Sequence, residues 1–200
     1  MVSVEVHLAN GLPAFTIVGL AEAEVRESRE RVRAALQNSG FDFPAGRITV
    51  NLAPADLPKE SGRFDLPIAL GILAASHQLP SSELDRYEFA GELSLTGELR
   101  PIRAALAMSH AMQRSGQPRR AFILPAANAA EAALVREAEI YPALSLVQVC
   151  AHFSAAHPEA RLVRMVSAPA AQDWHYPDFS EVRGQHQARR ALEKAYGCTG

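Results

Sequence analysis

The chain has 200 residues, of which 48% are hydrophobic and 21% are charged, a balance that excludes disorder over most of its length and fits one globular domain with a tail. A formal net charge of −2 excludes tight nucleic-acid binding through an overall basic surface. Cys150 and Cys198 stand apart without metal-ligand spacing, and no apolar run is long enough for a membrane helix or a signal peptide. We therefore expect a cytoplasmic protein without disulfides, bound metal or membrane partner.

Two strands and a helix are predicted for the first forty residues. Residues 2–8 alternate apolar with polar side chains, and the apolar, β-branched residues 14–20 predict a second strand paired with the first across the turn at 11–13. Helical spacing of apolar residues follows from Ala21 to Ser39, and Gly40 ends it. The arginines of this helix alternate with glutamates, so we predict a solvated helix face in preference to a nucleic-acid face for Arg26, Arg29, Arg31 and Arg33.

Strands and helices continue to mix through the rest of the chain. A strand is predicted at 47–52, a proline-containing loop at 53–63, and a buried helix at 64–77 with Pro67 in its first turn. The later elements are two short strands within 87–99, a helix at 104–115, a strand at 121–124, a helix at 129–137 and a last strand at 146–150. This order is neither a strict βαβ repeat nor separate blocks, and it predicts an α/β to α+β fold with a mixed sheet.

The end of the chain is predicted to hold a boundary between two units. Residues 158–177 show no sustained period and contain APAAQ, which is typical of a linker. A new unit begins at Asp178 with a helix predicted from Gln187 to Tyr196, and so short a helix has nothing in this chain to pack against.

None of the common nucleotide-binding or hydrolase motifs occurs: no G-x-x-x-x-G-K-[ST], no G-x-G-x-x-G, no H-E-x-x-H and no G-x-S-x-G. The seven histidines are scattered, so a zinc site would need distant partners. In the loop before the buried helix, Lys59 and Ser61 could form a base and a nucleophile. A serine in this position is far more often an N-cap, and Lys59 with Arg63 at a helix N-terminus could instead bind an anion.

Four segments spread from residue 11 to residue 193 carry a family resemblance: GLPAFTIVGL, RVRAALQNSGFDFPAGRITVNLAPADLPKESGRFDLPIALGIL, FAGELSLTGELRPIRAAL and DFSEVRGQHQARRALE. Together they resemble the N-terminal region of the ComM/YifB family of Mg-chelatase-like AAA+ proteins. The resemblance implies that residues 1–157 form a ChlI-type domain like the proteolytic domain of Lon, with the fold of ribosomal protein S5 domain 2. It also implies that residues 158–177 link this domain to the start of a truncated AAA+ module at 178–200.

The Lon-like peptidases that this domain resembles carry a serine before the buried helix and a lysine in the helix after the G-E-x-x-x-x-G-x-x-x-P-I segment. Ungapped comparison of KESGRFDLPIAL places the serine position at Arg63, and AGELSLTGELRPIRAAL places the lysine position at Leu106. Arginine is not a nucleophile here, and leucine accepts no proton. The resemblance therefore implies a Lon-like domain without peptidase activity, with a structural or interaction role.

The tail DFSEVRGQHQARRAL looks like the opening of an AAA+ module, in which Val182, Arg183, Gly184 and Gln185 would line part of an adenine pocket. A phosphate loop is expected only beyond Gly200, so we expect no useful ATP binding by this chain alone, and ATP with Mg²⁺ as cofactors of the full-length protein. The family's first strand looks shortened before Val2, and AYGCTG differs from the ending usual before a phosphate loop, so we expect a trimmed or interrupted gene product.

Three functions are implied by the resemblance. The first is a non-catalytic domain that serves an AAA+ module in cis, within a homo-hexamer that acts on DNA as a branch-migration helicase in natural transformation. The second is a degenerate peptidase that uses Ser61 and Lys59, against which Arg63 and Leu106 argue. The third is the motor subunit of a magnesium chelatase of tetrapyrrole synthesis, although that subunit lacks a Lon-like N-terminal domain.

Overall fold

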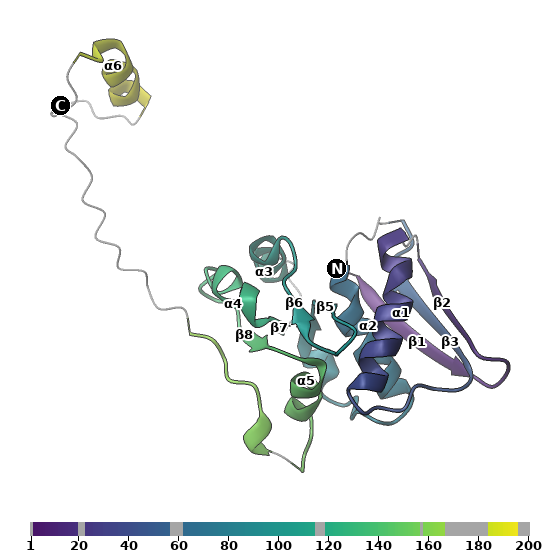
Figure 1. The fold of residues 1–200 in the computed structure, drawn as a ribbon. Coiled ribbons are helices and arrows are strands. Elements are labelled where there is room, and N and C mark those ends of the chain that lie inside the picture. Colours follow the sequence, from purple (N-terminus) through teal and green to yellow (C-terminus); the bar gives the residue numbers. More distant parts are fainter. Residues whose placement is uncertain are drawn as a thin grey trace. The chain divides into compact units, whose positions relative to one another are not determined.

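The computed structural model describes residues 2–19, 23–56, 62–114, 119–156, 158–166 and 184–195. The chain divides into two compact units, Met1–Ser167 and Ala168–Gly200, which are described separately (Figure 1). All the described strands belong to the first unit, where parallel and antiparallel pairs occur together. This mixture confirms the predicted α/β to α+β class.

The first sheet contains β1 (Ser3–Ala9), β2 (Ala14–Val18) and β3 (Arg47–Ala53) in the order β1-β3-β2. β1 runs antiparallel and β2 parallel to β3, so the prediction that the first two strands pair with each other is wrong. β3 takes the centre because its inward face is the most deeply buried, with no exposed surface on Ile48, Val50 or Leu52. β1 is left at one edge of the sheet.

α1 (Ala23–Asn38) and α2 (Asp65–Ala75) pack on this sheet and on each other (Figure 1). α1 ends before Gly40, whose φ of +81° confirms the predicted stop. α2 confirms the predicted buried helix and follows a 3-10 turn, η1 (Gly62–Phe64). Gly71 lets β1 approach α2 closely, because a Cβ there would lie 2.6 Å from Cγ2 of Val6. The fully buried residues of the two helices include Val25, Val32, Ala35, Leu36, Leu66, Ile68, Ile72 and Leu73.

The second sheet is parallel and contains β4 (Tyr87–Phe89), β7 (Ala121–Pro125) and β8 (Ile140–Ala143) in the order β4-β7-β8. η2 (Leu84–Arg86) leads into β4, and β5 (Glu92–Leu93) with β6 (Leu99–Arg100) forms an antiparallel hairpin after it. β7 is buried along its whole length, as expected for a central parallel strand. α3 (Ala105–Arg114) and α4 (Ala126–Ala132) pack against each other, and α4 starts earlier than the helix predicted at 129–137.

The last predicted strand, at 146–150, is wrong, because this segment is the helix α5 (Leu146–His152). The hydroxyl of Ser145 caps it by accepting the N–H of Gln148 at 3.3 Å. Leu146, Val149 and Cys150 face the core at helical spacing, whereas Val147 is 48% exposed. The strand of this region is β8, which lies just before the helix.

Residues 158–166, which we call the strap, are the last described residues of the first unit and pack against its earlier elements. They begin with η3 (Pro158–Ala160), bury Leu162, and pair Met165 with Ile140 of β8 in an antiparallel bridge. The first unit therefore extends past the boundary predicted at residue 157. In the second unit the structure describes α6 (His186–Ala195), where the helix from Gln187 to Tyr196 was predicted.

Candidate functional site

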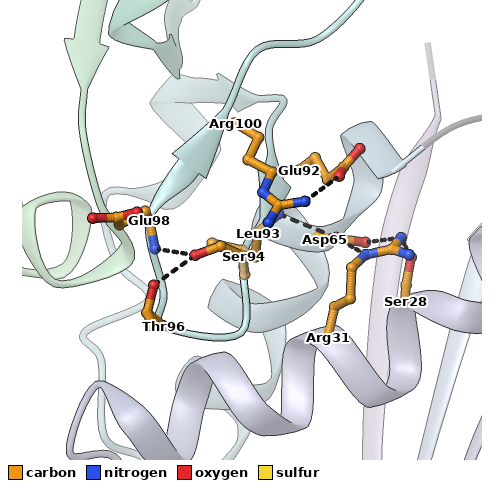
Figure 2. Close-up of polar contacts among 9 residues, drawn as sticks. All are labelled: Ser28, Arg31, Asp65, Glu92, Leu93, Ser94, Thr96, Glu98 and Arg100. Atoms are coloured by element: carbon orange, nitrogen blue, oxygen red, sulfur yellow. Dashed lines mark hydrogen bonds and ion pairs between the residues drawn. The ribbon is translucent and has the colours of Figure 1, made fainter.

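A buried ion pair joins α1 and α2, the two helices that pack on the first sheet (Figure 2). Asp65, the first residue of α2, has a fully buried side chain, and its carboxylate binds Arg31 of α1 through two hydrogen bonds. Nε donates to Oδ2 at 2.7 Å, and Nη2 donates to Oδ1 at 3.1 Å. Oδ2 also accepts the backbone N–H of Leu93 in β5 at 3.1 Å. The bond to Asp65 raises the pKa of the Arg31 guanidinium, which therefore stays charged.

This pair corrects the predicted solvated face of α1 at Arg31, whereas Arg26 and Arg29 are exposed as predicted. Only 21% of the Arg31 side chain is exposed. Arg33 also turns toward the protein, with its guanidinium carbon 4.8 Å from the centroid of the Phe43 ring. Sequence analysis missed the pair although a signal was present: Asp65 is the only Asp, Glu, Lys or Arg within residues 64–77, and a buried charge requires a partner.

The polar cluster continues into the β5–β6 hairpin (Figure 2). The hydroxyl of Ser94 accepts the N–H of Glu98 at 3.0 Å and lies 2.8 Å from the hydroxyl of Thr96. At the start of the hairpin, Arg100 lies 3.8 Å from the carboxylate of Glu92. These contacts close the hairpin on itself, and the bond from Leu93 to Asp65 joins it to the N-terminus of α2.

The arrangement of this cluster is that of a structural lock. Ser28 of α1 is fully buried, and its hydroxyl accepts a hydrogen bond from Nη2 of Arg31 at 3.2 Å. A serine nucleophile needs a base within hydrogen-bond reach, and a guanidinium cannot take a proton. The cluster therefore fixes α1, α2 and the hairpin relative to one another without a catalytic pair of this kind.

Arg63, which the sequence comparison predicts at the position of the Lon-type serine, lies in η1 directly before α2. Its guanidinium carbon lies 5.3 Å from the centroid of the Phe64 ring, within the range of a cation–π contact. Its carbonyl oxygen accepts the N–H of Gly91 at 2.9 Å, which ties η1 to the residues after β4. The side chain at this position is a cation and carries no hydroxyl.

Leu106, which the sequence comparison predicts at the position of the Lon-type lysine, lies in α3 and is 38% exposed. Its backbone N–H donates to Glu131 of α4 at 3.2 Å. The turn before α3 is held by Asn128, whose side chain accepts the N–H of Ile102 at 2.8 Å and donates to its carbonyl at 2.9 Å. Leu106 does not line the hollow of about 280 Å³ that Arg63 borders.

Two adjoining hollows of about 280 and 320 Å³ form a groove between β1, α2, α3 and β4, which we call the edge groove. Val2, Phe64, Glu88 and Phe89 line both hollows, so the groove is continuous. Burial raises the pKa of the Glu88 carboxyl, an effect that the charge of Arg120 reduces. The groove is also lined by Leu70 of α2 and by Met108, Ala111 and Met112 of α3.

A second buried contact holds the strap. Nδ1 of His152 accepts the backbone N–H of Leu162 at 2.9 Å, so the neutral ring carries its proton on Nε2, which donates to the hydroxyl of Tyr87 at 3.0 Å. Burial, and then the charge of Arg161, lowers the pKa of His152. Nearby, burial raises the pKa of the Cys150 thiol to about 12. Among the described residues, no group of three histidine, cysteine or acidic side chains could hold a metal ion.

Several candidate residues lie outside the described part of the chain. Lys59 and Ser61 precede η1, and Val182 with Arg183 precedes α6, but their placement is not described. The N-cap of α2 is Phe64, which makes no side-chain capping bond. Gly184 and Gln185 are described as exposed residues just before α6, and Gly184 has a φ of +83°. The proposed adenine-pocket segment is therefore described only in part.

The domain class is defined by residues 4–128, which match the family model described as subunit ChlI of Mg-chelatase. The chain is 47% identical over 194 residues to competence protein ComM of Haemophilus influenzae. It is also 47% identical over 196 residues to the uncharacterized protein YifB of Salmonella typhimurium, and each match covers 96% of this chain. An uncharacterized protein of Mycobacterium tuberculosis is 36% identical over 196 residues, or 98% of this chain. The chain therefore belongs to the ComM/YifB family of Mg-chelatase-like proteins.

These relatives are much longer than the matched region. The chain spans 37% of YifB and 38% of ComM and of the mycobacterial protein. Within the described residues, no helix is both long and apolar enough to cross a membrane.

Proposed function

We propose that this chain is the non-catalytic, Lon-like domain of a ComM/YifB-type AAA+ ATPase, where it positions the AAA+ module in cis within a cytoplasmic homo-hexamer. The observation that carries the proposal is the 47% identity to ComM along 96% of the chain. Arg63 and Leu106 support its non-catalytic part, because neither side chain supplies a nucleophile or a base. The buried lock of Arg31 and Asp65 suits a rigid positioning domain.

For the full-length protein we propose ATP with Mg²⁺ as the energy source and branched DNA as the substrate. The relative ComM is named a competence protein, which supports a role in DNA uptake, and from it we infer branch migration. The net charge of −2 gives this chain no basic excess, so the DNA contacts belong to other parts of the protein. Val182, Arg183, Gly184 and Gln185 are proposed to complete the adenine pocket of the AAA+ module.

A chimera tests this proposal. This chain replaces the matching 194 residues of ComM, and ATP hydrolysis and strand exchange on four-way DNA junctions are measured for ComM, the chimera and this chain alone. We expect the chimera to retain both activities and the chain alone to have neither. ATP hydrolysis by the 200-residue chain, or a folded chimera without junction activity, would contradict the proposal.

Two other functions have specific support. The serine and lysine at 61 and 59 suggest a degenerate peptidase, which predicts that a fluorophosphonate probe labels the chain and that Ser61→Ala abolishes the labelling. The matching family model is named after subunit ChlI of Mg-chelatase, which suggests the motor subunit of a chelatase. This function predicts that the chimera, combined with the remaining chelatase subunits, inserts Mg²⁺ into protoporphyrin. We expect neither activity.

A further inference from the structure

Two backbone N–H groups of the strap bond to earlier elements of the first unit. That of Leu162 donates to Nδ1 of His152 in α5 at 2.9 Å, and that of Met165 donates to the carbonyl of Ile140 in β8 at 2.8 Å. Leu162 is also the one residue within 158–166, all of them described, whose side chain is buried. The strap is therefore fixed to α5 and to β8 through a short stretch of its own sequence.

Much of the strap is loosely packed. Arg164 forms an ion pair with Glu139 at 3.4 Å, but these side chains are 46% and 51% exposed, and exposed pairs add little stability. Val163 is 80% exposed, and Arg161 of the strap and Phe153 line a hollow of about 160 Å³ beside it. A segment with so few buried contacts can open locally while the core stays folded.

We propose that the strap is a releasable latch, which detaches from α5 and β8 as one piece while the rest of the first unit stays folded. When seated, it fixes the point at which the chain leaves this unit for residues 168–200. When released, its nine residues become part of that connection and span at most about 30 Å. The inference rests on the proposed function, because it supplies a way to vary how closely the domain positions the AAA+ module in cis.

His152 couples the latch to a proton. The backbone N–H of Leu162 can only donate, so Nδ1 must keep its lone pair, and protonation of this nitrogen breaks the bond. Burial, and then the charge of Arg161, keeps the pKa of His152 below its ordinary value against the charge of Glu83, so the latch is seated near neutral pH. The titratable or charged side chains that face the ring from the elements packed around it are Tyr87 of β4, Tyr141 of β8, Glu83 and Arg161.

Amide hydrogen exchange of the 200-residue chain tests the release. We expect the amides of Leu162 and Met165 to share one opening equilibrium, at least tenfold more populated than the one that exposes the buried Phe122 amide of β7. Below pH 6.5 the protection of both strap amides should fall together, by up to about tenfold per pH unit, and His152→Asn should remove this dependence. Equal protection of all three amides, or unequal protection of Leu162 and Met165, would overturn the latch.

Two matched variants loosen the strap or leave it seated. Leu162→Ala removes its buried side chain, and Val163→Ala removes a neighbouring exposed one. We expect Leu162→Ala to lower the protection of the Met165 amide at least tenfold, while the Phe122 amide stays at least tenfold better protected than that of Met165. Val163→Ala should change neither. Loss of protection at Phe122 to the level of Met165 would overturn the proposal, because the whole unit would then open with the strap.

Spin labels measure the length of the connection. They are attached to His110→Cys on α3 and Lys194→Cys on α6, both at exposed positions, in a Cys198→Ser background. Their mean distance should increase when the Leu162 substitution is added and stay unchanged with the Val163 substitution. Equal distances would overturn the tether role of the strap. Because these measurements involve neither ATP nor DNA, a chimera without junction activity would contradict the proposed function without altering them.

Discussion

Arg31 and Asp65 stand 34 positions apart in the sequence, and their side chains meet in a two-pronged ion pair with a shortest N–O distance of 2.7 Å. The carboxylate is fully buried, and it also accepts the N–H of Leu93, so one side chain connects α1, α2 and β5. Removing either partner leaves a different group unpaired. The two changes therefore have different expected costs.

Arg31→Ala should destabilise the first unit by about 3–5 kcal/mol, because it leaves the buried carboxylate of Asp65 without its counter-ion. Asp65→Asn should cost less, since the side chain of Arg31 is 21% exposed and its charge is not fully buried. Urea unfolding followed by circular dichroism gives both free energies. The control is Arg119→Ala, which breaks an ion pair with Glu137 whose side chains are 73% and 66% exposed and should cost less than about 1 kcal/mol. Equal losses for Arg31→Ala and Arg119→Ala would contradict the buried lock.

His152 predicts a loss of stability in acid. The fold lowers its pKa below the ordinary value of 6.5, so the unfolded chain binds this proton more readily than the folded chain. The contribution of His152 is fully present above pH 6.5 and is lost as the pH falls through its lowered folded pKa, by at most about 1.4 kcal/mol per pH unit. Protonation of Nδ1 removes the acceptor for the N–H of Leu162, so the strap should loosen first.

The measurement is the free energy of unfolding of wild type and His152→Asn between pH 5 and 8. Asparagine can still accept the N–H of Leu162 but does not titrate, so its curve should be flatter than that of wild type below pH 6.5. Parallel curves for wild type and His152→Asn would assign the acid sensitivity to another group.

The sequence was sufficient for elements with a long, unbroken pattern. The buried face of β3 is confirmed because its apolar residues alternate throughout, and α2 is confirmed because its apolar run is longer than an ordinary strand. The run Leu146–Cys150 is too short and too β-branched to separate strand from helix, and the Ser145 cap decides it. Strand order and the partner of Asp65 depend on contacts between residues far apart, which no local pattern specifies. At the candidate site, the resemblance supplied positions 63 and 106, whereas the edge groove required the tertiary structure.

Cys150 should be almost unreactive in the folded protein. Its thiol is buried, and burial raises its pKa to about 12, so very little thiolate exists near neutral pH. In a Cys198→Ser variant, which retains only this thiol, dithionitrobenzoate at pH 8 should react slowly in buffer and completely within minutes in 6 M guanidinium. The reciprocal variant, Cys150→Ser, measures the background from the other thiol. Rapid native reaction in the first variant would show that α5 opens readily.

Gly19 should be the least replaceable of the glycines with positive φ in the first sheet and its connections. Its φ is +101°, and a Cβ there would lie 2.1 Å from the carbonyl oxygen of Leu52, a backbone atom of β3 that cannot move aside without breaking the sheet. Gly40 has a comparable φ of +81°, but a Cβ there meets nothing within 4 Å. Gly40→Ala should therefore cost only the conformational term of about 1–2 kcal/mol.

Gly19→Ala carries the same conformational cost and also pushes β2 away from β3. We expect it to lower the free energy of unfolding by about 2–4 kcal/mol in total. Thermal and urea unfolding of the two variants, measured side by side, isolate the steric part as the difference between them. Hydrogen exchange of the β2 and β3 amides should rise in Gly19→Ala and stay unchanged in Gly40→Ala. Equal destabilisation by the two substitutions would mean that the end of β2 shifts freely. The close approach of Gly19 to Leu52 would then contribute nothing to the register of β2 with β3.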